Sequence, residues 1–183
     1  MHLVLVGSKA CGKSTVGRIV ARSLGVPFED TDGVLEAIHT ERTGERKPFR
    51  EIYRETGEAY FRELEEEAVR RCLRAGGRVV ALGGGLPVRV PIGEALQRNF
   101  VVYLEASDDV LWARMSRDGL PVYLDPADPR ADFERVLAER RPVYERIADL
   151  RLDADRGPEV IAAEIVSHWK ARVREAKRRR TVG

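Results

Sequence analysis

Short apolar runs alternate with longer amphipathic stretches along this chain. The apolar runs are too short for helices and are bounded by turn-forming residues, which is typical of buried strands; they lie at 3–6, 26–28, 78–82, 100–104 and 150–152. Apolar residues recur at helical spacing between them, which predicts helices at 14–24, 56–76, 91–98, 107–115, 132–148 and 158–174. Strands that alternate with helices in this way form a parallel sheet with helices on both faces, so the pattern predicts a three-layer α/β fold.

The helical pattern is strongest at 56–76 and is lost at 116–129. Thr56 is a suitable N-cap and Gly76 a suitable stop, and the apolar side chains between them recur at Phe61, Leu64, Ala68 and Cys72. Ser107 is likewise placed to cap the helix that it begins. The segment 116–129 holds one glycine, three prolines and several aspartates, and no period. Loops of this length in a compact domain are often lids, so we expect a mobile lid here.

Length and charge limit the organisation of the chain. With 183 residues, 43% of them hydrophobic, it is long enough for one core, and we expect a single domain over residues 1–169. Residues 170–183 hold seven basic residues and one acid, although the net charge of the whole chain is only +2. A frayed, solvated basic tail at the end of the last helix is favoured over a nucleic-acid contact, because the rest of the chain shows no basic stripe.

Cysteine content and hydropathy indicate the compartment. Cys11 and Cys72 are the two cysteines of the sequence, too few for a disulfide framework, which favours a reducing cytoplasm. The chain begins without a basic leader, and no apolar run approaches the roughly 20 residues that cross a bilayer. We therefore expect neither secretion nor a membrane partner.

The segment from Gly7 to Ser14 matches the pattern G-x-x-x-x-G-K-[ST] at every fixed position. A predicted strand precedes it and a predicted helix follows it, which is the context that a phosphate-binding loop requires. Lys13 is placed to reach the β- and γ-phosphates of ATP or GTP, and the Ser14 hydroxyl to complete the coordination of Mg²⁺. The nucleotide-binding residues predicted from the loop are Gly7, Ala10, Cys11, Gly12, Lys13, Ser14 and Thr15. A chance glycine-rich turn is the weaker alternative.

Two carboxylates follow the second predicted strand. Asp30 and Asp32 lie at its carboxyl end, where ligands collect in open α/β sheets. One is placed to orient water on Mg²⁺, and the other to accept a hydrogen bond, and then the proton, from an acceptor hydroxyl. The alternative is ordinary capping of a helix that begins near Gly33.

These motifs, taken in order, resemble those of the shikimate kinases, from Leu3 to about Asp153. The motifs are the phosphate loop, Phe28-Glu29-Asp30-Thr31-Asp32, Gly57-Glu58 with Phe61-Arg62 and Glu65, Gly83-Gly84-Gly85, and Glu139-Arg140-Arg141-Pro142-Val143-Tyr144. The resemblance implies a five-stranded parallel sheet in the order 2-3-1-4-5. It also implies a monomeric kinase that transfers the γ-phosphoryl group of MgATP to the 3-hydroxyl of shikimate.

The resemblance also implies roles for individual residues. Lys13 and Asp32 would be catalytic, with Asp32 as the base, and Ser14 and Asp30 would hold Mg²⁺. Glu65 would orient Arg62, and an arginine at the base of the lid would pack on adenine. The residues implied to bind shikimate are Asp32, Arg62, Gly83, Gly84, Gly85 and Arg140, and the arginine implied for adenine is Arg114. A solvated ion pair on a helix is the ordinary alternative for Arg62, and Arg141 is the alternative to Arg140.

The lid departs from the family pattern. Leu120 stands where these kinases usually carry an arginine, and leucine cannot stabilise the charge that develops during transfer. Arg117 and Lys9 are the two candidates to replace that charge. Two other functions stay open: a kinase of the same fold for another small hydroxy acid or polyol, and a nucleotide-binding module that has lost catalysis.

Overall fold

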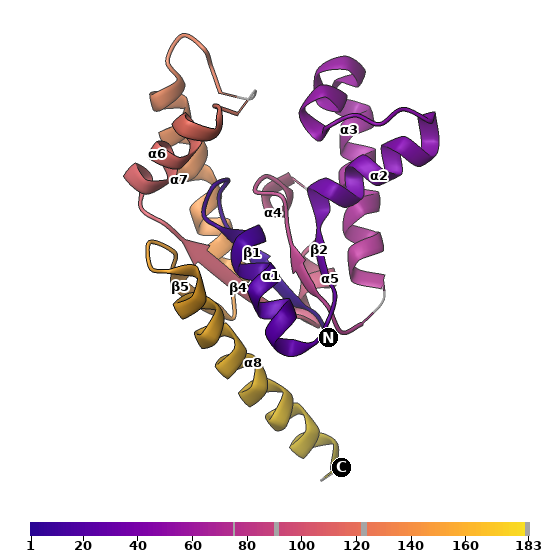
Figure 1. The fold of residues 1–183 in the computed structure, drawn as a ribbon, viewed down its shortest axis with the longest axis vertical. Helices are drawn as coiled ribbons and strands as arrows, with labels where there is room; N and C mark the ends of the chain where they lie inside the picture. Colours follow the sequence, from indigo (N-terminus) through magenta and orange to yellow (C-terminus); the bar gives the residue numbers. More distant parts are fainter. Residues whose placement is uncertain (75, 90–91, 122–123, 182–183) are drawn as a thin grey trace.

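The computed structural model describes residues 1–74, 76–89, 92–121 and 124–181. These residues form one five-stranded parallel sheet in the order β2-β3-β1-β4-β5, with helices around it (Figure 1). The strands are β1 (Leu3–Val6), β2 (Phe28–Asp30), β3 (Val79–Ala81), β4 (Phe100–Glu105) and β5 (Leu150–Asp153). The predicted α/β class and the strand order implied by the family resemblance are both confirmed.

The central strand β1 is buried on both faces, and its alternating side chains join two cores. Leu3 and Leu5 pack with apolar residues of helices α1 (Lys13–Leu24) and α8 (Pro158–Thr181). Val4 and Val6 point the other way, into a cluster that includes Val69 of helix α3 (Phe49–Arg74). A strand covered on both faces must be apolar at every position, which is why 3–6 contains no polar residue.

The register of the sheet brings three strand ends to one edge. Leu5 pairs with Ala81, and Asp30 of β2 pairs with the same Ala81. The loops that follow β1 and β3, and helix α2 that follows β2, therefore begin side by side. Parallel strands expose these carboxyl ends together, and ligand sites of α/β folds form there.

The remaining helices of the described residues include those that flank this edge. Figure 1 shows α2 and α3 rising on one side of it and α6 and α7 on the other. Their bounds are α2 (Thr31–Thr43), α4 (Leu86–Arg89), α5 (Gly93–Gln97), α6 (Asp108–Asp118) and α7 (Pro129–Ile147). No helix within the described ranges is long and apolar enough to cross a membrane.

The second strand and the helix after it differ from the sequence prediction. The predicted strand 26–28 is observed at Phe28–Asp30, because the Val26 amide completes the end of α1 by donating to the Ala21 carbonyl, and Pro27 has no amide to donate. Helix α2 was not among the helices predicted from apolar spacing, and the sequence suggested it only as the alternative explanation of Asp30 and Asp32. Its buried apolar residues are few and the rest of the helix is polar, so its helical period is weak.

Helix α3 begins earlier than predicted and is kinked. It starts at Phe49 rather than Thr56, and its backbone leaves the helical region at Gly57, where φ is 81° and ψ is 176°. The Thr56 hydroxyl donates to the Ile52 carbonyl at 2.8 Å, so Thr56 belongs to the turn before the kink and does not cap the helix after it. A positive φ favours glycine, which explains why the kink falls at Gly57.

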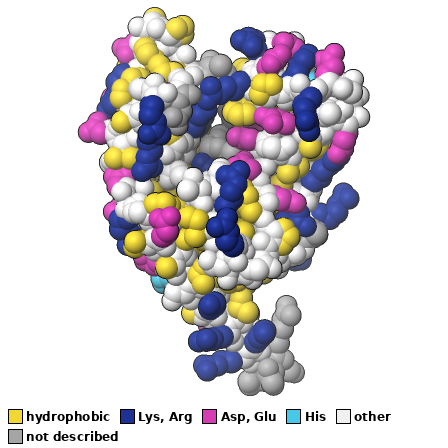
Figure 2. All heavy atoms as spheres, in the orientation of Figure 1, with side chains coloured by type: hydrophobic (Ala, Val, Ile, Leu, Met, Phe, Trp, Pro, Cys, Tyr) yellow, Lys and Arg dark blue, Asp and Glu magenta, His cyan; other side chains and the backbone are white. Residues whose placement is uncertain are grey.

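The other differences concern where helices begin and end. The helix predicted at 91–98 is the short α5, preceded by the unpredicted α4, and residues 90–91 between them lie outside the described residues. Helix α6 continues to Asp118 and α7 begins at Pro129, so both ends of the predicted loop 116–129 are helical, and residues 122–123 of that loop are not described. Helix α8 continues to Thr181 through the basic segment rather than ending near 174, and Figure 2 shows Lys and Arg side chains gathered on this end.

Candidate active site

The loop after β1 is shaped by its glycines and closed by Lys13. Gly7 has a φ of 142°, and a Cβ there would lie 2.5 Å from the Leu104 carbonyl oxygen, so only glycine fits this position. The Lys13 ammonium donates to the carbonyl oxygens of Gly7 at 2.9 Å and of Ser8 at 2.8 Å. The loop therefore holds the positive charge of Lys13 at the N-terminus of α1, where the helix dipole also favours an anion.

Asp30 connects the loop to the second strand. Its Oδ2 accepts a hydrogen bond from the Ser14 hydroxyl at 2.5 Å, and its Oδ1 accepts one from the Asp32 amide at 3.2 Å, which caps α2. Capping was the alternative that the sequence left open, and the structure shows it together with the contact to Ser14.

The oxygens of Ser14 and Asp30 suit a Mg²⁺ ion. Mg²⁺ prefers hard oxygen donors and usually takes one or two from the protein, with the others from water and substrate phosphates. The described residues contain no group of three or more His, Cys, Asp or Glu that could enclose a metal. This donor set therefore fits an ion that shares its ligands with a nucleotide.

Asp32 faces the backbone turn that follows β3. The Gly83 amide donates to the Thr31 hydroxyl at 2.8 Å, and this brings Gly83 so close that a Cβ there would lie 2.9 Å from Asp32 Oδ1. Removal from water, followed by repulsion from Asp30, raises the pKa of Asp32 to about 6, although Lys13 opposes the change. A carboxylate with this pKa can accept a proton near neutral pH.

Arg62 and Glu65 form the predicted pair on α3. Arg62 Nη1 donates to Glu65 Oε2 at 2.7 Å, and Nη2 donates to Glu58 Oε1 at 2.6 Å. Glu65 is a buried carboxylate, with 5% of its surface exposed. Because a buried charge is stable only with a partner, Glu65 fixes the guanidinium of Arg62 in one orientation. The predicted contact is confirmed.

The adjacent arginines of α7 are separated by their surroundings. Arg140 lines a cavity at this edge of the sheet, whereas Arg141 donates to Asp108 of α6. One turn further along α7, the buried Tyr144 hydroxyl donates to the Gly84 carbonyl and ties the glycine turn to this helix. The geometry therefore favours Arg140 over Arg141 as the residue that faces a ligand.

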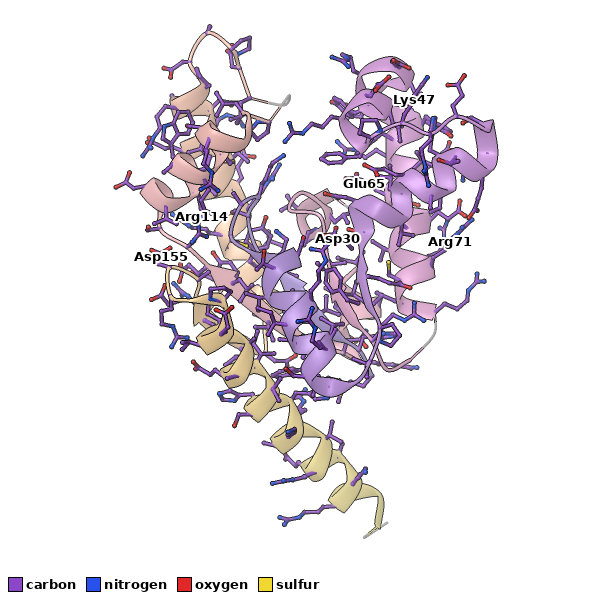
Figure 3. All side chains as sticks on the ribbon, in the orientation of Figure 1. Asp30, Lys47, Glu65, Arg71, Arg114 and Asp155 are labelled. Carbon is purple, nitrogen blue, oxygen red and sulfur yellow. The ribbon has the colours of Figure 1, made fainter. Side chains whose placement is uncertain are left out.

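These elements enclose one cavity of about 540 Å³, a size typical of small-molecule sites. Figure 2 shows the surface hollowed between the α6–α7 side and the α2–α3 side, and in Figure 3 Arg114 lies on one side of the phosphate loop with Asp30 and Glu65 on the other. All the predicted site residues except Gly7 line the cavity. They are Ala10, Cys11, Gly12, Lys13, Ser14, Thr15, Asp30, Asp32, Arg62, Gly83, Gly84, Gly85, Arg114 and Arg140.

The lid side of the cavity is partly described. Arg114 Nη1 donates to the Ala10 carbonyl at 3.1 Å, which joins α6 to the phosphate loop. Arg117 and Pro121 line the cavity, and Lys9 lines it from the loop, so both candidates for the replacement charge face it. Leu120 is 38% exposed.

Sequence reasoning missed several residues that line the cavity. The additional lining residues include Phe49, Arg50, Tyr53, Phe61 and Arg156. Phe61 was predicted as a core residue, and it packs edge to face with Tyr53 across the kink at Gly57. Aromatic residues on both sides of Gly57 were the available signal, but their meeting depends on the kink.

Comparison with known proteins gives a consistent result. The family model for shikimate kinase matches residues 9–170. Shikimate kinases of Mycobacterium avium and Pseudomonas syringae pv. tomato are 40% and 38% identical, over 92% and 91% of this chain and 93% and 94% of their own. The solved structure of shikimate kinase from Acinetobacter baumannii in complex with shikimate superimposes with a TM-score of 0.82 and 29% identity, covering 93% of each chain.

Proposed function

This chain belongs to the shikimate kinase family, and from this membership we propose that it transfers the γ-phosphoryl group of ATP to the 3-hydroxyl of shikimate, giving shikimate 3-phosphate and ADP. One observation carries the proposal: Lys13 of the phosphate loop, the carboxylate of Asp32 and the guanidinium of Arg62 line the same cavity. A phosphate cation, a base and a carboxylate receptor are the three groups that this reaction needs.

The nucleotide end of the cavity is assigned to the phosphate loop. The ammonium of Lys13 donates to the Gly7 and Ser8 carbonyls, within the loop whose amides would bind the phosphates. From this position it can turn toward the phosphates of a bound nucleotide. Mg²⁺, when bound, neutralises charge on the β- and γ-phosphates, and Ser14 and Asp30 would hold it. The proposed nucleotide-binding residues are Gly7, Ala10, Cys11, Gly12, Lys13, Ser14, Thr15 and Arg114.

The acceptor end is assigned to the residues around Asp32. Arg62 and Arg140 would bind the shikimate carboxylate, for which the planar guanidinium is suited. The backbone of Gly83, Gly84 and Gly85 would approach the ring without side chains in the way. The bond from the acceptor oxygen to phosphorus forms as the bond from phosphorus to ADP breaks, and Asp32 accepts the hydroxyl proton.

We also propose that the protein acts as a monomer in the cytoplasm, without a nucleic-acid partner. Cys11 and Cys72 are free and buried, which supports a reducing compartment. The basic end of α8 then serves only as a solvated surface. Size-exclusion chromatography with light scattering would test the monomer, since a dimer mass would contradict it.

The function is tested by following ADP release with MgATP, with and without shikimate. We expect turnover that needs shikimate and falls at least about 100-fold in Asp32→Asn, which keeps the shape of the carboxyl group but cannot accept the proton. Asp109→Asn, at a carboxylate that is 93% exposed on α6, is the matched control and should retain wild-type turnover. ATP binding without turnover on shikimate would refute the proposal and direct the search to other small hydroxy acids.

A further inference from the structure

Arg50 reaches across the mouth of the cavity. It belongs to the first turn of α3, and its Nη1 lies 3.7 Å from the position that a Cβ on Gly119 would occupy. Gly119 follows α6 on the opposite side of the cavity and immediately precedes Leu120. The guanidinium of Arg50 therefore lies at the base of the lid, although the residue comes from the acceptor side.

Arg50 differs from the other arginines of the cavity in its partners. Arg62 pairs with two glutamates, Arg114 donates to the Ala10 carbonyl, and Arg156 pairs with Glu164. Within the described ranges, Arg50 forms no ion pair or hydrogen bond through its side chain. Its one specific contact is with the ring of Phe49, whose centroid lies 6.0 Å from the guanidinium carbon. A half-buried guanidinium without an anion is free to receive one from a ligand.

The position of Arg50 indicates which anion it receives. Lys9 of the phosphate loop lies over the same Phe49 ring, with its Nζ 5.7 Å from the centroid, so Arg50 shares this ring with a cation of the loop that would hold the phosphates. Arg117 lines the cavity from the lid side. An anion bound in the cavity would attract the positive charges that line it from both sides, Arg50 among them.

We propose that Arg50 is a further catalytic residue, which contacts the γ-phosphoryl group during its transfer; the proposal rests on the proposed function. The migrating group spreads negative charge over its equatorial oxygens while the acceptor bond forms and the bond to ADP breaks. Arg50 stabilises this charge from the acceptor side of the cavity. Arg50 supplies a positive charge next to Leu120, the lid position whose own side chain is uncharged.

The experiment compares Arg50→Ala and Arg50→Lys with wild type. Arg54→Ala is the matched control, because Arg54 lies four residues further along the same helix and is exposed. We expect kcat to fall about 100-fold in Arg50→Ala, as when one preorganised donor to a developing charge is removed, and to recover in part in Arg50→Lys. KM for shikimate and Kd for MgADP should stay within about twofold of wild type in all three variants.

A second readout separates charge stabilisation from structure. Aluminium fluoride bound with MgADP and shikimate imitates the migrating group, so Arg50→Ala should weaken binding of this complex about 100-fold while binding MgADP normally. An unchanged kcat, or an effect confined to KM for shikimate, would overturn the role of Arg50 and leave the proposed function standing. Absence of shikimate-dependent turnover in the wild type would overturn the proposed function, and this role with it.

Discussion

Replacing Gly83 with alanine would move the proposed base without moving the fold. A Cβ at Gly83 would lie 2.9 Å from Asp32 Oδ1, and ordinary contacts begin at 3.4 Å, so the carboxylate must shift by about 0.5 Å. A misplacement of about 1 Å costs about 100-fold in rate, and half of it should cost about tenfold, or about 1.4 kcal/mol. The Gly83 amide keeps its bond to the Thr31 hydroxyl, so the free energy of unfolding should change little.

The assay is kcat/KM for shikimate at saturating ATP, together with nucleotide affinity by calorimetry and Tm. Gly33→Ala is the control, because a Cβ there meets nothing within 4 Å, and it should leave all three quantities near wild type. Wild-type kcat/KM in Gly83→Ala would refute the reasoning. A loss of rate accompanied by an equal loss of nucleotide affinity would refute it as well, because the shift would then have spread beyond Asp32.

Three further outcomes follow from contacts and burial. Arg62→Ala should raise KM for shikimate by about 30-fold or more and leave KM for ATP unchanged. Arg70→Ala, on an exposed part of α3, is the control and should change neither KM. Equal rises in both KM values would contradict the assignment of Arg62 to the shikimate carboxylate. Folding raises the pKa of Asp32 from 3.8 to about 6, so the native state loses stability as the pH rises through this range, by up to about 3 kcal/mol. Asp32→Asn should therefore raise Tm relative to wild type at pH 7.5 but not at pH 4, and a constant difference would count against the raised pKa. Burial raises the pKa of the Cys72 thiol to about 12. In the variant Cys11→Ser, Cys72 should therefore not react with a disulfide reagent at pH 8 until urea unfolds the protein. Rapid reaction in the folded protein would show that Cys72 is accessible to solvent.

The strands were predictable because their apolar runs are local signals. The run 3–6 coincides with β1, and 100–104 and 150–152 each fall one residue short of the observed strand. The second strand was placed too early, because the sequence does not show that the Val26 amide is already bonded to the end of α1. The strand order came from the family resemblance, since apolar period alone does not determine which strands are neighbours.

Residues of the site were predictable to different degrees. The phosphate loop is continuous in sequence, so its residues could be found from their spacing alone. The pairing of Arg62 with Glu65 was also within reach, since three residues on a helix bring side chains together. Arg50 was not, because its place in the cavity depends on the kink at Gly57 and on the approach of α3 to Gly119, two features that involve distant parts of the chain.

Asp30 shows that a structural interpretation and a functional one need not be alternatives. One carboxylate oxygen accepts the Asp32 amide and caps α2, which fixes the direction of the second oxygen. That second oxygen meets the Ser14 hydroxyl, the other proposed Mg²⁺ ligand, at the start of α1. The cap therefore holds the carboxylate where an ion beside the phosphate loop would need it, and it begins the helix that presents Asp32 to the acceptor. A change that removed only the cap should loosen both functions together.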